Sequence, residues 1–293
     1  MHIDKYPMLS IMTRRILTTL IAIIAITNIA HAQLYFDNKI KNHKQYADSI
    51  RKAFDNGPYF TLYRDNYFIG GIPLGEEIKR TNSDVKFQVS IAQRLTKSVL
   101  PFNTYLFLTY SQKCFWNVFE ESLPMHDLNF NPGIGLSKLL IVKGKLIGKA
   151  TMLIEHESNG RDGDASRSWN RITFGANVYI TPHLMIHGKV WIPIIDGENN
   201  KDLLDYRGIY ESGMQIRSSN DRWGFALVTS KRRGWNLNTN ITVEVNYRLF
   251  HDENQYFFIQ YYNGYAENLL DYKQHHSRIR AGLVIKPNFF SEY

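Results

Sequence analysis

A histidine, a serine and an asparagine lie close together in the stretch HESNGRDGDASRSWNR, residues 156–171. His156 stands two residues before Ser158, and Asn170 follows that serine by twelve residues. Serine becomes an effective nucleophile when a neighbouring base accepts its proton, and histidine is a natural base for it. The imidazole needs a third group on its other nitrogen to fix its tautomer, and the amide oxygen of Asn170 can supply it. These residue types suit acyl transfer if the fold brings them together.

The elements that must position these residues are strands. Apolar and polar residues alternate with period two through most of the chain, which is the pattern of a strand with two different faces. In DVKFQVSIAQ, for example, Val85, Phe87 and Val89 share one face, and Lys86 and Gln88 share the other. One helix is expected at residues 44–54. Twelve strands are expected, near residues 59–71, 82–96, 101–116, 127–142, 145–158, 167–181, 183–194, 207–218, 222–231, 235–249, 255–264 and 275–287.

Two architectures could use twelve such strands: a soluble sandwich and a transmembrane barrel. The strands are about ten residues or longer, which is enough to cross a bilayer when tilted. Their polar faces carry charge, as a wet or networked lumen tolerates. Aromatic residues gather at strand ends near 261–265 and 287–293, which suits interfacial aromatic girdles. The pattern favours an all-β, twelve-stranded antiparallel transmembrane barrel of the bacterial outer membrane over residues 59–293. The sandwich remains the alternative.

The N-terminus has the pattern of an export signal. Arg14 and Arg15 precede an apolar run, which ends at Ala30-His31-Ala32. Basic residues, an apolar core and a small-x-small ending predict a secretory signal peptide at residues 1–32. The initiator could then be Met8 or Met12, and residues 33–58 would lead into the barrel. The alternative is a retained membrane anchor.

Composition narrows the class of protein further. The mean hydropathy is −0.33, and no run of eighteen apolar residues follows the N-terminus, which argues against a helical membrane protein. Cys114 is the single cysteine, so the fold contains no intramolecular disulfide. The net charge is +8, but no cluster of Lys and Arg points to nucleic acid. The scattered basic residues suit an anionic lipid or lipopolysaccharide surface.

The strand pattern also predicts which way the three candidate residues face. His156 and Ser158 share parity with Met152 and Ile154 on the apolar face of their strand. Asn170 likewise shares parity with the apolar residues of the next strand. All three would therefore face lipid, where a polar side chain is costly and is a functional hypothesis by default. If the chain enters from the periplasm, the connecting loop is external, and its segment RDGDAS could hold calcium.

The same stretch resembles the signature of the outer-membrane phospholipase A family, H-x-S-N-G-R followed by S-R-S-W-N-R. Three further segments, VKFQVSIAQRL, YSQKCFWNVFEESLP and YYNGYAENLLDYKQHHSRIRAGLV, are similar to strands and loops of that family. The resemblance covers essentially the whole chain after the signal. It implies a calcium-dependent homodimeric barrel that hydrolyses acyl esters of phospholipids and lysophospholipids and stays latent until the membrane is damaged.

The resemblance also implies roles for individual residues. Ser158 would be the nucleophile, His156 the base and Asn170 the orienting residue, while the amide of Gly160 would help bind the oxyanion. The other roles concern calcium and the dimer: the carbonyls of Arg161 and Ser166 and the hydroxyl of the partner's Ser122 would hold the ion, Asp202 would support it through water, and Gln112 would lie in the dimer interface.

The sequence departs from the family pattern near these calcium positions. Gly163 replaces a common acidic residue, although Asp162 and Asp164 flank it. The segment before Ser122 is about two residues shorter, and His126-Asp127 replaces an Arg-Glu pair. Two rivals to the hydrolase remain: a non-enzymatic barrel with vestigial site residues, and a secreted lipase with a β-sandwich.

Overall fold

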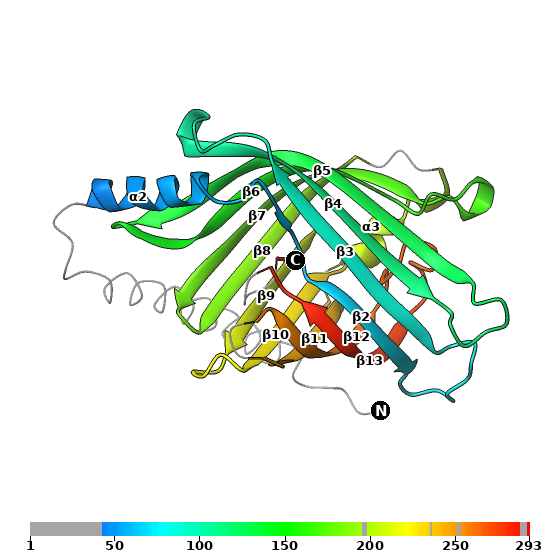
Figure 1. The fold of residues 1–293 in the computed structure, drawn as a ribbon. Helices are drawn as coiled ribbons and strands as arrows, with labels where there is room; N and C mark the ends of the chain where they lie inside the picture. Colours follow the sequence, from blue (N-terminus) through cyan, green and yellow to red (C-terminus); the bar gives the residue numbers. More distant parts are fainter. Residues whose placement is uncertain (1–42, 195–197, 235, 251–252, 288–291) are drawn as a thin grey trace, which may run out of the picture.

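Twelve antiparallel strands, β2 to β13, close into a barrel in the computed structural model (Figure 1), which describes residues 43–194, 198–234, 236–250, 253–287 and 292–293. The ring closes because β2 pairs with both β3 and β13. A short strand, β1 (Phe60–Leu62), pairs with β3 next to β2, so β1 and β2 together form the first predicted strand segment. The barrel strands are β2 Asn66–Pro73, β3 Asp84–Arg94, β4 Thr104–Trp116, β5 Met125–Val142, β6 Lys145–Ser158, β7 Ser168–Thr181, β8 Leu184–Ile194, β9 Tyr210–Arg217, β10 Trp223–Lys231, β11 Thr239–Arg248, β12 Gln255–Gly264 and β13 His276–Ile285.

The two faces of this sheet have opposite character, as the alternation predicts. On β6, Ile154 is 56% exposed on the outer face and the next residue, Glu155, is 3% exposed inside. Charged and polar side chains fill the lumen, and apolar ones cover the outside. This distribution is the reverse of that in a soluble sandwich and is typical of a transmembrane barrel. The barrel prediction is confirmed, and the sandwich alternative is wrong.

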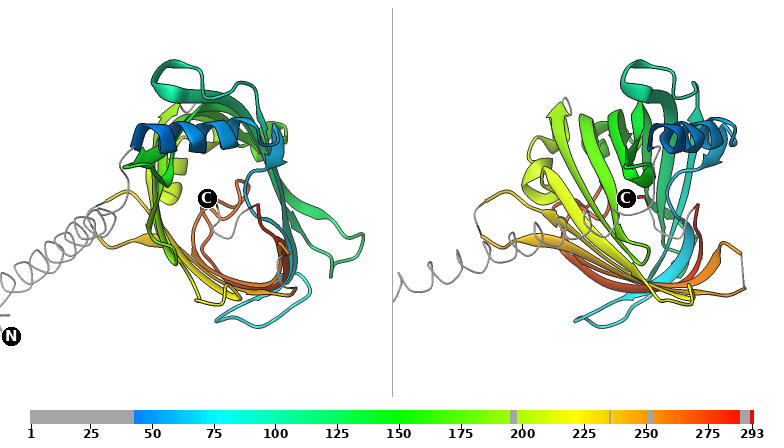
Figure 2. Two further views of the ribbon diagram at one scale, coloured as in Figure 1. Left: turned by 60° about the vertical axis from the view of Figure 1, so that its left-hand side comes forward. Right: turned by 90° about the vertical axis from the view of Figure 1, so that its left-hand side faces the viewer.

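A helix covers one end of the barrel. Helix α2 (His43–Asp55) matches the predicted helix and lies across the end of the ring where β5 turns into β6 (Figures 1 and 2). Arg94 holds its C-terminus, because the guanidinium donates hydrogen bonds to the carbonyls of Phe54, Asp55 and Gly57 at 2.6–3.0 Å. These bonds satisfy carbonyls that a helix end leaves without partners.

Loops fill the opposite end of the barrel. The β8–β9 connection contains α3 (Leu203–Arg207), and the β12–β13 loop covers residues 265–275. Both contribute to one buried apolar cluster, whose members are Trp169, Trp191, Leu203, Ala266, Leu269 and Tyr272. Three short 3-10 helices complete the connections: η1 Pro101–Asn103, η2 Gly163–Ala165 and η3 Glu198–Asn200.

The lumen between the two ends is largely filled by side chains. A cavity of about 150 Å³ remains there, lined mainly by charged and polar residues. Glu292 and Tyr293 also line it: Glu292 pairs with Lys149 at 2.5 Å, and the Tyr293 ring stacks on His187. The end of the chain therefore lies inside the ring (Figure 2). Assigning this tyrosine to an interfacial aromatic girdle was wrong.

The N-terminal predictions fall on a part of the chain for which the structure gives no description. The predicted signal peptide at residues 1–32 and the following ten residues lie outside the described residues. Within the described ranges, no helix is long and apolar enough to cross a membrane.

Candidate active site

The candidate base and its orienting residue lie opposite each other on β6 and β7. The antiparallel register pairs His156 with Asn170, and Ser158 with Ser168. The imidazole Nδ1 lies 2.8 Å from the amide Oδ1 of Asn170. Since the amide oxygen accepts, Nδ1 carries the proton and Nε2 is left free to accept one. This is the tautomer that a histidine base requires.

Ser158 lies on the same outward face of β6 as His156, two residues further along the strand. Alternate residues of a strand share a face and are separated by about 6.8 Å along it, so the two side chains are neighbours. In the part of the chain that the structure describes, the serine hydroxyl forms no hydrogen bond. Hydrogen bonds between nucleophile and base are often long before substrate binds, so this arrangement is compatible with a triad.

The backbone at Gly160 requires glycine. Its φ is +63°, in the left-handed region, and a Cβ there would stand 3.0 Å from a ring carbon of Phe130. Among the described residues, no acceptor receives a hydrogen bond from the Gly160 amide. A free, exposed N–H two residues after Ser158 can stabilise the oxyanion of an ester under attack.

The β6–β7 loop is held in shape by Asn159, which is 3% exposed. Its main-chain N–H donates to the carbonyl of Arg167 at 3.0 Å, and its side-chain Oδ1 accepts from the main-chain N–H of Arg167 at 2.9 Å. Its Nδ2 donates to the carbonyl of Ala165 at 2.9 Å. Asn200 fixes the start of β7 from the neighbouring connection, because its Nδ2 donates to the carbonyl of Ser168 at 2.8 Å. The loop beside the candidate nucleophile is therefore preorganised.

Oxygen donors suited to calcium lie in and around this loop. The carbonyls of Arg161 and Ser166 belong to it, and each has two lone pairs. The carbonyl of Ser166 already accepts a hydrogen bond from the Arg167 guanidinium at 2.8 Å, which leaves one lone pair. Asp162 and Asp164, on either side of Gly163, are exposed. The donor set fits a hard cation, although the described residues include no cluster of three His, Cys, Asp or Glu side chains that could hold a metal.

Asp202 is already engaged by other residues. Lys273 Nζ lies 2.7 Å from its Oδ2, and the hydroxyl of Tyr272 donates to its Oδ1. Burial works to raise the pKa of Asp202, but the hydrogen bonds from Lys273 and Tyr272 hold that pKa below its ordinary value. The carboxylate is thus ionised at neutral pH and could support a cation only by sharing these partners.

Ser122 lies exposed in the loop between β4 and β5, at φ +68°. Arg161 links this region to the β6–β7 loop, because its guanidinium donates to the carbonyls of Met125 and His126 at the start of β5. Within the described chain, no hydrogen bond joins Ser122 to Arg161 or Ser166. Its predicted role depends on a second copy of the chain.

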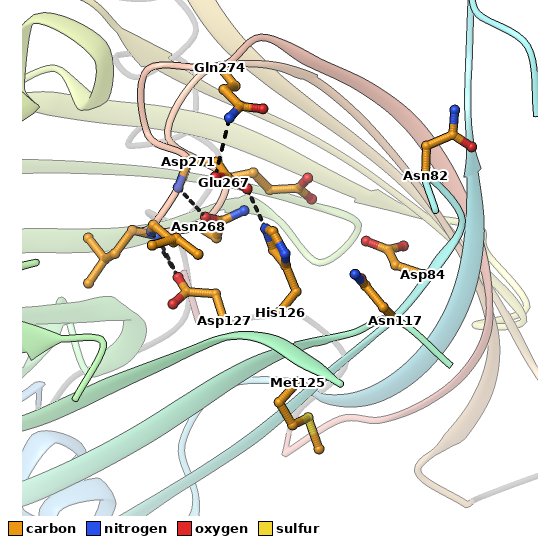
Figure 3. Close-up of polar contacts among 12 residues, drawn as sticks. Asn82, Asp84, Asn117, Met125, His126, Asp127, Glu267, Asn268, Asp271 and Gln274 are labelled. Atoms are coloured by element: carbon orange, nitrogen blue, oxygen red, sulfur yellow. Dashed lines mark hydrogen bonds and ion pairs between the residues drawn. The ribbon is translucent and has the colours of Figure 1, made fainter. Parts of the chain in front are cut away.

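The residues that replace the family's Arg-Glu pair hold the β12–β13 loop in place (Figure 3). Asp127 is fully buried, and its Oδ2 accepts hydrogen bonds from the amides of Leu269 and Leu270 at 3.1 and 3.0 Å. His126 forms a short hydrogen bond with Asp271 of the same loop. Asp127 also lies 3.9 Å from the Arg161 guanidinium, so these two residues fix the β12–β13 loop and contact the β6–β7 loop as well.

Gln112 is a polar residue on the outer, lipid-facing side of β4. It accepts a hydrogen bond from the Tyr110 hydroxyl at 2.9 Å, and its Nε2 lies 3.5 Å from the sulfur of Cys114, both on the same face. A carboxamide in this position fits a contact with a second protein better than a contact with lipid alone.

Sequence reasoning missed residues on the lumen side of the site. Arg171 lies between Glu155 and Glu157, with nitrogen–oxygen distances of 3.1 and 2.6 Å. Trp169 also donates to Glu157, at 3.1 Å. Asn131, on β5, donates to the main-chain carbonyl of His156 at 2.9 Å. Alternation along β6 is enough to place the two glutamates in the lumen, but only the strand register shows which residues they meet.

The fold and the site together define a transmembrane barrel that carries hydrolase-type side chains on its outer face. A family model described as Phospholipase A1 matches residues 72–285. The chain therefore belongs to the phospholipase A1 family. It is 29% identical to Phospholipase A1 of Proteus vulgaris and 28% identical to that of Escherichia coli K12; each match covers 70% of this chain and 71% of the relative.

Solved structures agree with this assignment in their fold. Outer membrane phospholipase A from Escherichia coli aligns with a TM-score of 0.68 at 23% identity, over 78% of this chain and 94% of that one. The Salmonella typhi outer membrane phospholipase, a dimer with bound calcium, aligns with a TM-score of 0.69 at 23% identity, over 86% of this chain and 100% of that one. The protein is thus an outer-membrane phospholipase, and the non-enzymatic alternative is wrong.

Proposed function

We propose that this enzyme cleaves phospholipid acyl esters with Ser158, His156 and Asn170. The hydroxyl of Ser158 attacks the ester carbonyl while Nε2 of His156 accepts its proton. The histidine then protonates the leaving alcohol, and later activates the water that releases the fatty acid. Asn170 keeps the imidazole in the required tautomer through the 2.8 Å contact with Nδ1. That contact, on the outer face beside Ser158, is the observation that carries the proposal.

The free amide of Gly160 supplies the first donor for the oxyanion. A developing negative charge near the lipid boundary gains more from a fixed donor than it would in water, because the surroundings screen it less. Glycine adopts the left-handed backbone at this position, φ +63°, without the strain that a side chain would bring.

Calcium is the cofactor that the donor set of the loop supports. The carbonyls of Arg161 and Ser166 would hold the ion, with Ser122 from the partner subunit and with Asp202 through water. When bound, calcium would add positive charge near the oxyanion, which a neutral Asn170 does not provide. The two arginines of the loop, Arg161 and Arg167, would have to turn away from the ion.

The substrate is met in the outer leaflet. The site lies on the outward face of the wall, at the end of β6 next to the longer β6–β7 loop, and longer loops are external in this class of barrel. Phospholipids and lysophospholipids would be cleaved at the first or second glycerol position. Lipopolysaccharide would be the neighbouring lipid, and the enzyme would stay latent until membrane damage brings substrate to it.

A homodimer would complete the site, because Ser122 lies exposed in a single chain. Gln112 on the outer face of β4 would lie in the interface. Residues 1–32 would direct export and then be removed, residues 33–58 would form the lead-in segment, and residues 59–293 the barrel.

Fatty-acid release from detergent-solubilised phospholipid tests the proposal. The Ser158→Ala variant should release fatty acid at least about a thousandfold more slowly than the wild type in calcium. Activity of the variant equal to the wild type would refute the triad. Wild-type activity should also fall when calcium is chelated, and return when calcium is restored; full activity in chelator would discard the metal. Cross-linking yield should rise with calcium if the dimer is the active form.

A further inference from the structure

Asn131 is a lumen-facing side chain of β5 that contacts the strand carrying His156. It is 7% exposed, and its Nδ2 donates a 2.9 Å hydrogen bond to the main-chain carbonyl of His156. The imidazole of the same residue points outward to Asn170. A single side chain inside the barrel therefore holds the backbone of a residue whose side chain works outside it.

This hydrogen bond fills a gap in the sheet. The β5–β6 ladder pairs Phe130 with Ser158 and Gly133 with Glu155, and the same register places Pro132 opposite His156. Proline has no N–H to donate, so the ladder lacks a donor at that position. A buried carbonyl without a partner is costly. Asn131, one residue before the proline, supplies the missing donor with its side chain.

The orientation of the Asn131 amide is fixed from the lumen. Arg171 Nη2 donates to Asn131 Oδ1 at 3.3 Å. A guanidinium only donates, so the amide oxygen faces Arg171 and the amide NH₂ faces His156. Arg171 is itself held by Glu155 and Glu157, the two residues that flank His156 on β6. The contact to His156 is thus the end of a buried network with one defined orientation.

We infer that Asn131 is a positioning residue for the catalytic base. It fixes the peptide unit of His156 where the ladder is interrupted, so that Nδ1 meets Asn170 on the face that also carries Ser158. The inference rests on the proposed role of His156. Without the bond, the His156 carbonyl would turn toward another donor or water, and the imidazole would turn with it.

Steady-state kinetics of the full-length protein in detergent, with calcium, test this inference. Asn131→Ala removes the donor, and Asn131→Asp keeps the shape of the side chain but replaces the donor with an acceptor. Both variants should lower kcat by roughly tenfold to a hundredfold, the size expected for a misplacement near 1 Å. KM should stay close to the wild-type value, because Asn131 lies inside the barrel and substrate binds outside.

Ser137 provides a matched control on the same two strands. Its hydroxyl donates to the carbonyl of Ala150 at 3.1 Å, and it is 1% exposed. Ser137→Ala therefore removes one buried side-chain bond from β5 to a carbonyl of β6, but far along the strand from His156. Its kcat should match that of the wild type. An equal loss of kcat in Ser137→Ala and the Asn131 variants would overturn the inference, because general loosening of the strand pair would explain both.

A double variant separates positioning from a merely structural role. If Asn131 acts by presenting His156 to Asn170, Asn131→Ala should cost less than about threefold in kcat once Asn170→Ala has removed that contact. An undiminished loss in the Asn170→Ala background would overturn the inference, and so would wild-type kcat in both Asn131 variants. Failure of the proposed function looks different, because Ser158→Ala would then remain active.

Discussion

The two faces of the β6–β7 pair carry polar residues of different kinds, although alternate positions of the same two strands build both. Inside, Glu155, Glu157 and Arg171 are 3%, 7% and 5% exposed, and the arginine pairs with both carboxylates. Outside, His156 and Asn170 are half-buried and contact each other. The lumen side carries a network of ion pairs, whereas the outer side carries a hydrogen-bonded histidine and asparagine.

The lumen side of this strand pair therefore contributes to stability, and its outer side carries the residues proposed for catalysis. Buried charges stabilise only when their partners are present, and the two glutamates have Arg171 and, for Glu155, also Arg64 at 3.7 Å. A histidine and an asparagine at a lipid face bring a desolvation cost. Polar groups are retained in that position for function. Asn131 connects the two sides, because it contacts Arg171 in the lumen and the main chain of His156.

Removing the base is expected to have the largest effect on the outer face. His156→Ala should lower kcat by about 10⁴-fold or more, because nucleophile and base act as one unit. The free energy of unfolding should change little, since the imidazole contributes one hydrogen bond at the lipid boundary. Fatty-acid release and urea unfolding in lipid vesicles measure the two quantities.

Ile154→Ala is the control for that experiment. Ile154 occupies the preceding outward position on β6 and is 56% exposed, so its truncation should leave kcat near the wild-type value. If His156→Ala retained a tenth of the activity, the outer face would not be the reactive one.

Breaking the ion pairs on the lumen side should affect the free energy of unfolding more than it affects kcat. Arg171→Met leaves two buried carboxylates without their main partner, and should destabilise the barrel by about 3–5 kcal/mol. Urea unfolding in vesicles measures this loss. Activity should fall too, because Asn131 loses the guanidinium that orients its amide.

A rescue experiment for Arg171→Met replaces the two carboxylates by neutral side chains in the same protein. Adding Glu155→Gln and Glu157→Gln removes the uncompensated charges, so the triple variant should recover more than half of the lost unfolding free energy. An unchanged free energy of unfolding in Arg171→Met would mean that the ion pairs of the lumen side do not hold β6 and β7 together.

Much of this comparison could be predicted from the sequence, because parity is a local property. Alternation along β6 and β7 is enough to place His156 and Asn170 on one face and Glu155 and Glu157 on the other. The same alternation, with strand length, predicted all twelve barrel strands. The signature stretch then indicated the family, since its spacing follows from two strands and one loop.

The contacts across the lumen could not be predicted in this way, because they depend on strands far apart in the chain. From the sequence alone, Asn131 and Pro132 have no evident role in β5. Their role becomes visible only when the β5–β6 register places the proline opposite His156. Asp127 reads as a replaced acidic residue, and its partners Leu269 and Leu270 lie about 140 positions away. Tyr293 belonged to an aromatic segment, which suggested a girdle, but its ring lies in the lumen.

Replacing the orienting residue sharpens the outer half of the comparison. Asn170→Ala removes the acceptor from Nδ1 of His156, and should lower kcat by roughly a hundredfold, less than loss of the base itself. Asn170→Asp restores an acceptor and should recover part of that loss. Steady-state kinetics check both variants. Equal kcat for Asn170→Ala and the wild type would show that His156 does not depend on Asn170 for its orientation.

The smallest expected effect lies in the β12–β13 loop, where His126 contacts Asp271 (Figure 3). Burial works to raise the pKa of Asp271, but the hydrogen bond from His126 holds that pKa below its ordinary value. A carboxyl of this kind stabilises the fold fully above its unfolded value, about 3.9, and loses the contribution as pH falls through the lower folded value. Protection from hydrogen exchange in residues 265–275 should therefore weaken below about pH 4. The same hydrogen bond raises the pKa of His126 above its ordinary value, so protection should also weaken as pH rises through that raised value. Asp271→Asn should abolish that acid-dependent change; if it persisted in the variant, another carboxyl would be responsible.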